Sequence, residues 1–104
     1  MVTQYTVYYA DGRPFESGTV ELNQVPSYKE LKKFLSRWFD DSQGIHFEHV
    51  FINCTQVGSE KSMFVDDVGF LKGLPFNSAV SDQHEFYPGR IYGTAVVMSR
   101  RVWY

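Results

Sequence analysis

The stretch from Phe64 to Met98 constrains the fold of this chain more than any other. Two short apolar segments stand at its ends, separated by a turn rich in glycine and proline and by a polar run. The second segment, Thr94–Met98, predicts a central strand, because strands buried on both faces are apolar throughout. Asn77 follows the turn, and its side chain is suited to cap a short helix over residues 78–86. The stretch predicts strand, turn, short helix and returning strand, and it holds no catalytic signature.

Two strands are predicted near the N-terminus, over residues 3–10 and 15–22. Both segments place apolar, β-branched or aromatic residues at every second position, which is the period of a strand. Asp11-Gly-Arg-Pro14 between them is typical turn chemistry. We expect a β-hairpin with a loop longer than two residues.

The segment Tyr28–Phe39 predicts the main helix. Ser27 and Glu30 fit a capping box, in which each side chain satisfies a free backbone N–H. Apolar residues recur behind them at helical spacing, and basic residues occupy the other side. The apolar stripe is Tyr28, Leu31, Phe34, Leu35 and Trp38, and the basic residues are Lys29, Lys32, Lys33 and Arg37. We expect the stripe to pack into a core rather than to bind a cofactor.

The remaining strands complete an α+β domain. Residues 47–57 carry apolar side chains on both faces and predict an interior strand, and residues 63–65 begin its partner. The order of elements predicts one domain over residues 1–104. It has a mostly antiparallel sheet of about five strands, one main helix at about 28–39 and a short helix after Asn77.

Composition excludes several classes of function. Ten Lys and Arg against twelve Asp and Glu give a net charge of −2, and only Arg100-Arg101 hints at the basic patch of a nucleic-acid binder. The single cysteine excludes an internal disulfide. The chain shows no signal sequence and no apolar run of membrane-spanning length. We therefore expect a cytoplasmic domain that binds neither nucleic acid nor membrane.

Three groups of residues in the sequence could carry chemistry. His46 and Glu48 imitate half of a zinc-deaminase motif whose cysteine half is absent. Cys54 would be a nucleophile if a histidine served as its base, but no helix N-terminus is predicted nearby to lower its pKa. Asp66-Asp67 resembles half of a cation site. Strand-edge polar residues, a buried cysteine and a solvated turn explain the same residues, so we expect no catalytic residue, no metal and no cofactor.

Asn77, Tyr92 and Thr94 are the candidate ligand-binding residues. A small polar pocket lined by the three would bind a nucleotide or another small metabolite. The competing interpretation is structural, with Asn77 as a helix cap and Gly93 at a close approach of two backbones. As a plain cap, Asn77 should tolerate replacement by Asp or Ser, because each keeps an acceptor.

The same stretch resembles a family of small domains of unknown function from bacteriophages, plasmids and some bacteria. The family's mark is a Gly-x-Leu-x-Gly-Leu-Pro-x-Asn turn followed by a Tyr-Gly-Thr-Ala-Val-Val strand. The match covers about residues 64–98 and includes Gly69, Leu71, Gly73, Leu74, Pro75, Asn77, Tyr92, Gly93, Thr94 and Ala95. The resemblance carries no activity to transfer, and it implies a small accessory protein of a mobile element.

The aromatic content leads to the main functional hypothesis. Aromatic residues make up 17% of the chain, and a small sheet with one substantial helix should leave some of them exposed. We expect a non-enzymatic protein-interaction module that binds a partner or forms a homodimer. The predicted contact residues are Tyr5, Tyr8, Tyr9 and Phe51. The alternative is small-molecule binding at the Asn77, Tyr92 and Thr94 region.

Overall fold

The structure is a computed structural model, and it describes residues 1–39, 47–52, 61–66, 69, 71–83 and 91–103. For residues 48, 50–52 and 81–83 the description covers the backbone alone. The elements are β1 (Val2–Tyr8), β2 (Glu16–Glu21), α1 (Tyr28–Phe39), β3 (Glu48–Ile52), β4 (Lys61–Val65), α2 (Ser78–Gln83) and β5 (Ala95–Met98).

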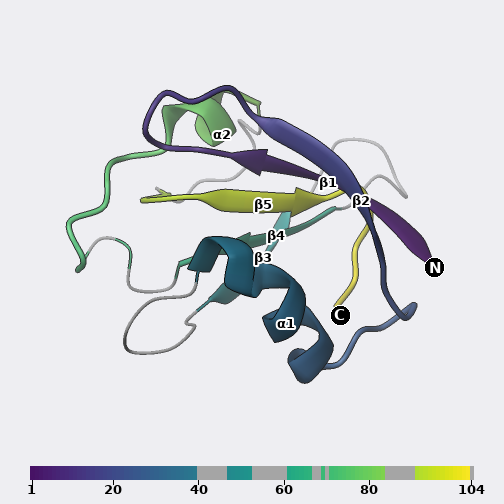
Figure 1. The fold of residues 1–104 in the computed structure, drawn as a ribbon. Helices are drawn as coiled ribbons and strands as arrows, with labels where there is room; N and C mark the ends of the chain where they lie inside the picture. The colour runs from purple at the N-terminus through teal and green to yellow at the C-terminus, as the bar shows by residue number, and fades with distance from the viewer. Residues whose placement is uncertain (40–46, 53–60, 67–68, 70, 84–90, 104) are drawn as a thin grey trace.

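The strands of the described residues form one antiparallel sheet in the order β2-β1-β5-β4-β3 (Figure 1). The last strand, β5, lies between β1 and β4, which confirms that it is central. The α+β class, the antiparallel pairing and the presence of one main helix and one short helix are likewise confirmed. In the described residues β3 lies at an edge, so its prediction as an interior strand is wrong.

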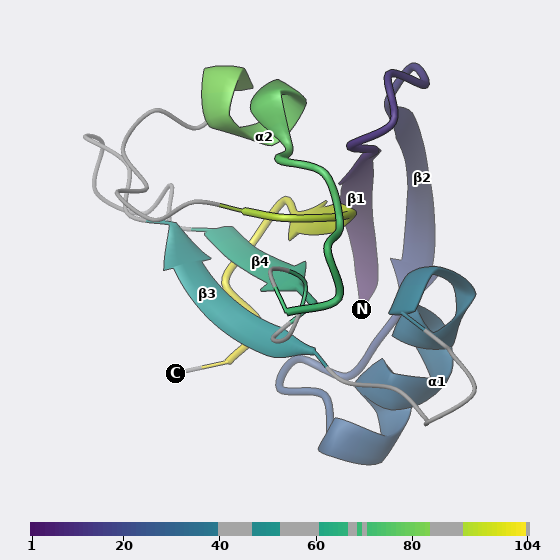
Figure 2. The same cartoon turned by 90° about the vertical axis from the view of Figure 1, so that its left-hand side faces the viewer.

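The two helices lie on opposite sides of the sheet (Figures 1 and 2). Alternation along each strand divides the apolar residues between two cores. The α1 core contains Tyr5, Val7, Leu22, Leu31, Phe34, Leu35, Phe39, Phe64, Val96, Met98 and Val102. The α2 core contains Tyr8, Met63, Val65, Val80, Ile91, Ala95 and Val97.

The main helix begins and ends at the predicted residues. The Ser27 hydroxyl accepts a hydrogen bond from the N–H of Glu30 at 3.1 Å, as a capping box requires. The Glu30 carboxylate differs from the prediction, because it accepts hydrogen bonds from the backbone N–H and the amide of Asn23, both at 3.0 Å. The helix is therefore attached to the end of β2 by a side chain in its first turn.

Two predicted surface residues are core residues. Tyr5 retains 7% of its exposure and packs edge-on against Phe34 of α1, while Tyr8 retains 9% and lies in the α2 core. The prediction that they form an exposed contact surface is wrong, because a helix covers each face of the sheet at these positions. Tyr9 is half-buried, and the side chain of Phe51 lies outside the described residues.

Leu35 tests the stability supplied by the α1 core. Its side chain is completely buried, so Leu35→Ala should lower the free energy of unfolding by about 2–5 kcal/mol. Lys32→Ala, at an exposed position of the same helix, should change it by less than about 0.5 kcal/mol. Urea unfolding of both variants measures the difference, and equal losses would contradict the assignment of the buried face.

Candidate functional site

Asn77 is completely buried and joins three separate segments. Its side-chain Oδ1 accepts a hydrogen bond from the N–H of Val80 at 3.1 Å, which confirms it as the cap of α2. Its Nδ2 donates to the carbonyl oxygens of Tyr8 at 2.8 Å and of Gly93 at 2.9 Å. Both amide hydrogens and the amide oxygen are thus used within the chain, and this side chain serves as a structural tie.

The turn before Asn77 pairs with the segment that contains Tyr92. The N–H of Asn77 donates to the carbonyl of Ile91 at 2.8 Å, and the N–H of Gly93 donates to the carbonyl of Pro75 at 2.9 Å. Phe76 and Tyr92 form an isolated bridge, and their ring centroids are 6.0 Å apart. The two parts of the sequence motif are therefore held together by backbone pairing.

Two glycines of the motif have structural roles, one through packing and one through its backbone conformation. A Cβ at Gly69 would meet the carbonyl oxygen of Tyr92 at 2.3 Å, so the close approach of two backbones occurs here. The sequence placed that approach at Gly93, which has a φ of 89° and faces the side chain of Leu74 instead. Structural demands thus explain Gly69, Asn77 and Gly93 among the residues on which the resemblance to phage and plasmid domains rests.

A hollow lined in part by Thr94 has a volume of about 220 Å³. Thr94 lines it together with Asp11, Arg13, Trp38, Asp66 and Pro75, but Asn77 and Tyr92 do not. The charged groups in its wall already have partners, since Arg13 pairs with Asp11 and Lys72 pairs with Asp66, each at 2.8 Å. Neither of the hollows that the described residues form brings Asn77, Tyr92 and Thr94 together, and Thr94 alone of the three lines this one.

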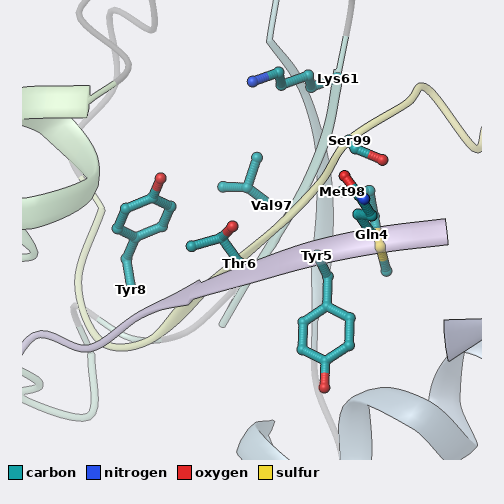
Figure 3. Close-up of a pocket in the computed structure, with 8 residues that line it drawn as sticks. All are labelled: Gln4, Tyr5, Thr6, Tyr8, Lys61, Val97, Met98 and Ser99. Carbon is teal, nitrogen blue, oxygen red and sulfur yellow. The ribbon is translucent and has the colours of Figure 1, made fainter. Parts of the chain in front are cut away.

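A second hollow lies on the α2 side of the sheet and has a volume of about 210 Å³. Figure 3 shows Thr6, Tyr8, Val97 and Lys61 on one side of the strands and Tyr5 on the other. Burial raises the pKa of Tyr8, so its hydroxyl stays neutral at physiological pH. Hydroxyl groups and one lysine make this wall polar.

A group of partly exposed aromatic side chains lies where α1, the segment that leads into β3 and the C-terminal segment meet. Tyr28 is 55% exposed and stacks on Phe47, with the ring centroids 5.3 Å apart and the planes inclined by 15°. Phe47 contacts Trp103, and Trp103 contacts His49, with centroid distances of 6.3 and 5.5 Å. We call Tyr28, Phe47, His49 and Trp103 the aromatic surface.

Hydrogen bonds to Pro26 and Ser62 hold the residues of this aromatic surface in place. The Nε1–H of Trp103 donates to the carbonyl of Pro26 at 2.7 Å. The buried hydroxyl of Ser62 accepts from the N–H of Val102 and lies 2.8 Å from Nε2 of His49. Burial lowers the pKa of His49, and the charge of Arg101 lowers it further. Sequence reasoning placed Tyr28 in the core stripe and did not connect it with Phe47 or Trp103.

The other predicted groups offer little chemistry in the described part of the chain. Tyr9 donates to Glu16 at 2.7 Å and accepts from Trp38 at 3.3 Å, and Arg13 covers its ring. Among the described residues, no three side chains of the metal-binding types His, Cys, Asp and Glu come together. His46, Cys54, Asp67 and His84 lie outside the described residues, and so does the side chain of Glu48.

Comparison of the chain with protein-family models, with curated proteins and with solved structures found no match. None of the described helices combines the length and the apolar character needed to cross a membrane. The geometry of the sites is therefore the basis on which a function can be proposed.

Replacement of Asn77 tests its role as a tie. Asn77→Ala removes the cap and leaves two buried carbonyls without their donor, so we expect a loss of about 2 kcal/mol or more. Asn77→Asp and Asn77→Ser keep an acceptor but lose both donors, so neither should be neutral, which corrects the expectation from sequence. Thermal unfolding of the three variants decides it, and a wild-type melting temperature in Asn77→Asp would contradict the tie.

His49 should make stability depend on pH. Its native pKa is lowered, so the unfolded state binds the proton first as the pH falls below about 6.5. Stability should be fully present above that pH and decline as the pH falls through the lower native pKa. His49→Gln cannot titrate, so its unfolding free energy should lose this component. Identical pH profiles for the variant and the wild type would contradict the prediction.

Proposed function

We propose that this chain is a non-enzymatic protein-interaction module whose contact surface is the aromatic surface. The observation that carries the proposal is the Tyr28 ring, which stays 55% exposed while Phe47 supports its inner face. Tyrosine and tryptophan are enriched among the residues that dominate binding energy at protein interfaces. A ring already held in place loses little conformational freedom on binding.

The surroundings of Tyr28 enlarge the surface available to a partner. Val25 is 59% exposed and precedes Pro26, whose carbonyl accepts the hydrogen bond from Trp103. Apolar and aromatic groups from α1, from the segment before it and from the chain's C-terminal part therefore adjoin one another. Phe15 is 61% exposed and, like Tyr28, has one described ring contact, but its neighbour Tyr8 is a buried residue of the α2 core.

Small-molecule binding is the alternative, and the hollow beside Thr94 is the place for it. Its volume of about 220 Å³ is below the roughly 300–1,000 Å³ typical of ligand pockets. Small-molecule binding at this region would use the amide of Asn77 as a ligand contact, but that amide already makes hydrogen bonds within the chain. A clear rise in melting temperature with a single nucleotide or metabolite would favour this alternative over the interaction module.

The cellular setting of the proposal comes from the sequence. We propose that the protein acts in the cytoplasm and that it comes from a bacterium or a mobile element, as the resemblance implies. Its partner is another protein or a second copy of this chain. Sedimentation of the purified protein over a range of concentrations distinguishes these two cases, because self-association depends on concentration.

Tyr28→Ser is the direct test of the proposed surface. We expect it to weaken partner binding or self-association by at least about tenfold, as the loss of a central aromatic anchor does. Phe15→Ser is the matched control, because it removes an equally exposed ring beside Tyr8 in the α2 core. Both variants should keep near-native melting temperatures. Equal effects of the two substitutions on binding would contradict the proposal.

A further inference from the structure

One exposed side of α1 carries an isolated group of positive charges. Lys29, Lys32, Lys33 and Arg37 are all exposed, and we call them the basic face. Lys29, Lys33 and Arg37 follow one another at intervals of four residues, which places them along one side of the helix. The first and last are separated by a rise of about 12 Å.

These four charges are not neutralised by the described part of the chain. None of the four makes an ion pair with another described residue, whereas Arg13, Lys72 and the N-terminal ammonium each do. Glu30 is the acidic residue of the helix, and its carboxylate is directed to Asn23. A chain with a net charge of −2 thus presents a concentrated positive face.

The basic face is continuous with the aromatic surface. Lys32 lies one turn beyond Tyr28 on the same side of the helix, so the basic face borders the aromatic surface there. On the far side of the surface, Arg101 is near enough to lower the pKa of His49. Positive charges therefore lie on two sides of the partly exposed rings.

We propose that the partner is an acidic polypeptide segment that lays carboxylates along the basic face and an apolar side chain on Tyr28. This inference rests on the proposed function and names the chemistry of the partner. Carboxylates spaced over about 12 Å match two turns of a helix or a short extended segment. Complementary charge would select the partner and speed its approach, and the aromatic contact would hold it.

Among the described residues, the edge strand of a second copy fits the face less well. The exposed edge strand β2 carries Glu16 and Glu21 at its ends, and both already have partners within the chain, the hydroxyl of Tyr9 and the N-terminal ammonium.

Single-stranded nucleic acid also combines negative charge with groups that stack on aromatic rings. Nucleic-acid-binding domains usually carry a net positive charge, whereas this chain has a net charge of −2, and the test includes the nucleic acid as a competitor.

The test uses the full chain and three fluorescent amphipathic peptides. They share a leucine stripe, and the residues beside it are Glu in the first, Gln in the second and Lys in the third. Fluorescence anisotropy should show tightest binding for the Glu peptide, with the Gln peptide weaker by about tenfold and the Lys peptide weaker still. Binding of the Glu peptide should fall as salt rises from about 50 to about 500 mM, because exposed charges are screened.

Charge substitutions locate the effect. Lys29→Gln with Lys33→Gln should weaken binding of the Glu peptide by about fivefold or more. Thr19→Glu with Ser78→Glu is the matched control, since it lowers the net charge equally at exposed positions of β2 and α2. The control should stay within about twofold of the wild type.

The outcomes separate the inference from the proposed function. Equal binding of the Glu and Gln peptides, both lost in Tyr28→Ser, would overturn the acidic partner and leave the aromatic surface intact. Loss of Glu-peptide binding in the lysine variant but not in Tyr28→Ser would retain the charge effect and refute the aromatic surface. No binding of any peptide, or stronger binding of an oligo-dT strand than of the Glu peptide, would overturn the inference.

Discussion

The hydrogen bonds of one buried amide hold the architecture together. Asn77 connects the end of β1, the start of α2 and the turn before β5 through Tyr8, Val80 and Gly93. The Asn77 amide donates hydrogen bonds to the carbonyls of Tyr8 and Gly93. The chain can therefore leave β1 and approach β5 without burying a carbonyl that lacks a hydrogen bond. The position of α2 over the sheet follows from this tie, and with it the closure of the α2 core around Tyr8.

Coverage of both faces determines where aromatic residues are available to a partner. β1 contributes Tyr5 to one core and Tyr8 to the other, so these two rings are buried by folding and are not available to a partner. A sheet with one covered face would have left Tyr8 on the surface. A group of described rings that remains accessible lies at the border of α1 and β3, where Phe47 and Trp103 are only partly covered.

Local patterns predicted what depends on neighbouring residues. The bounds of α1, the Ser27 cap and the capping role of Asn77 are set within one helical turn, and each was visible in the sequence. The role of the Asn77 amide as a hydrogen-bond donor was not visible in the sequence, because the Tyr8 carbonyl that accepts the bond lies 69 residues away. The stacking of Tyr28 on Phe47 likewise depends on how α1 packs against β3, and helical periodicity alone assigns Tyr28 to the core stripe.

The same non-local contacts give the aromatic surface its rigidity. Ser62 of β4 holds both His49 and the backbone of Val102, so the sheet and the C-terminal segment fix two sides of the surface at one hydroxyl. Trp103 is anchored separately, through Pro26, to the segment that leads into α1. A partner would meet rings whose positions are already determined, and the entropy lost on binding would fall mainly on the partner. The basic face is different, since flexible lysines contribute to the approach of a charged partner more than to its final hold.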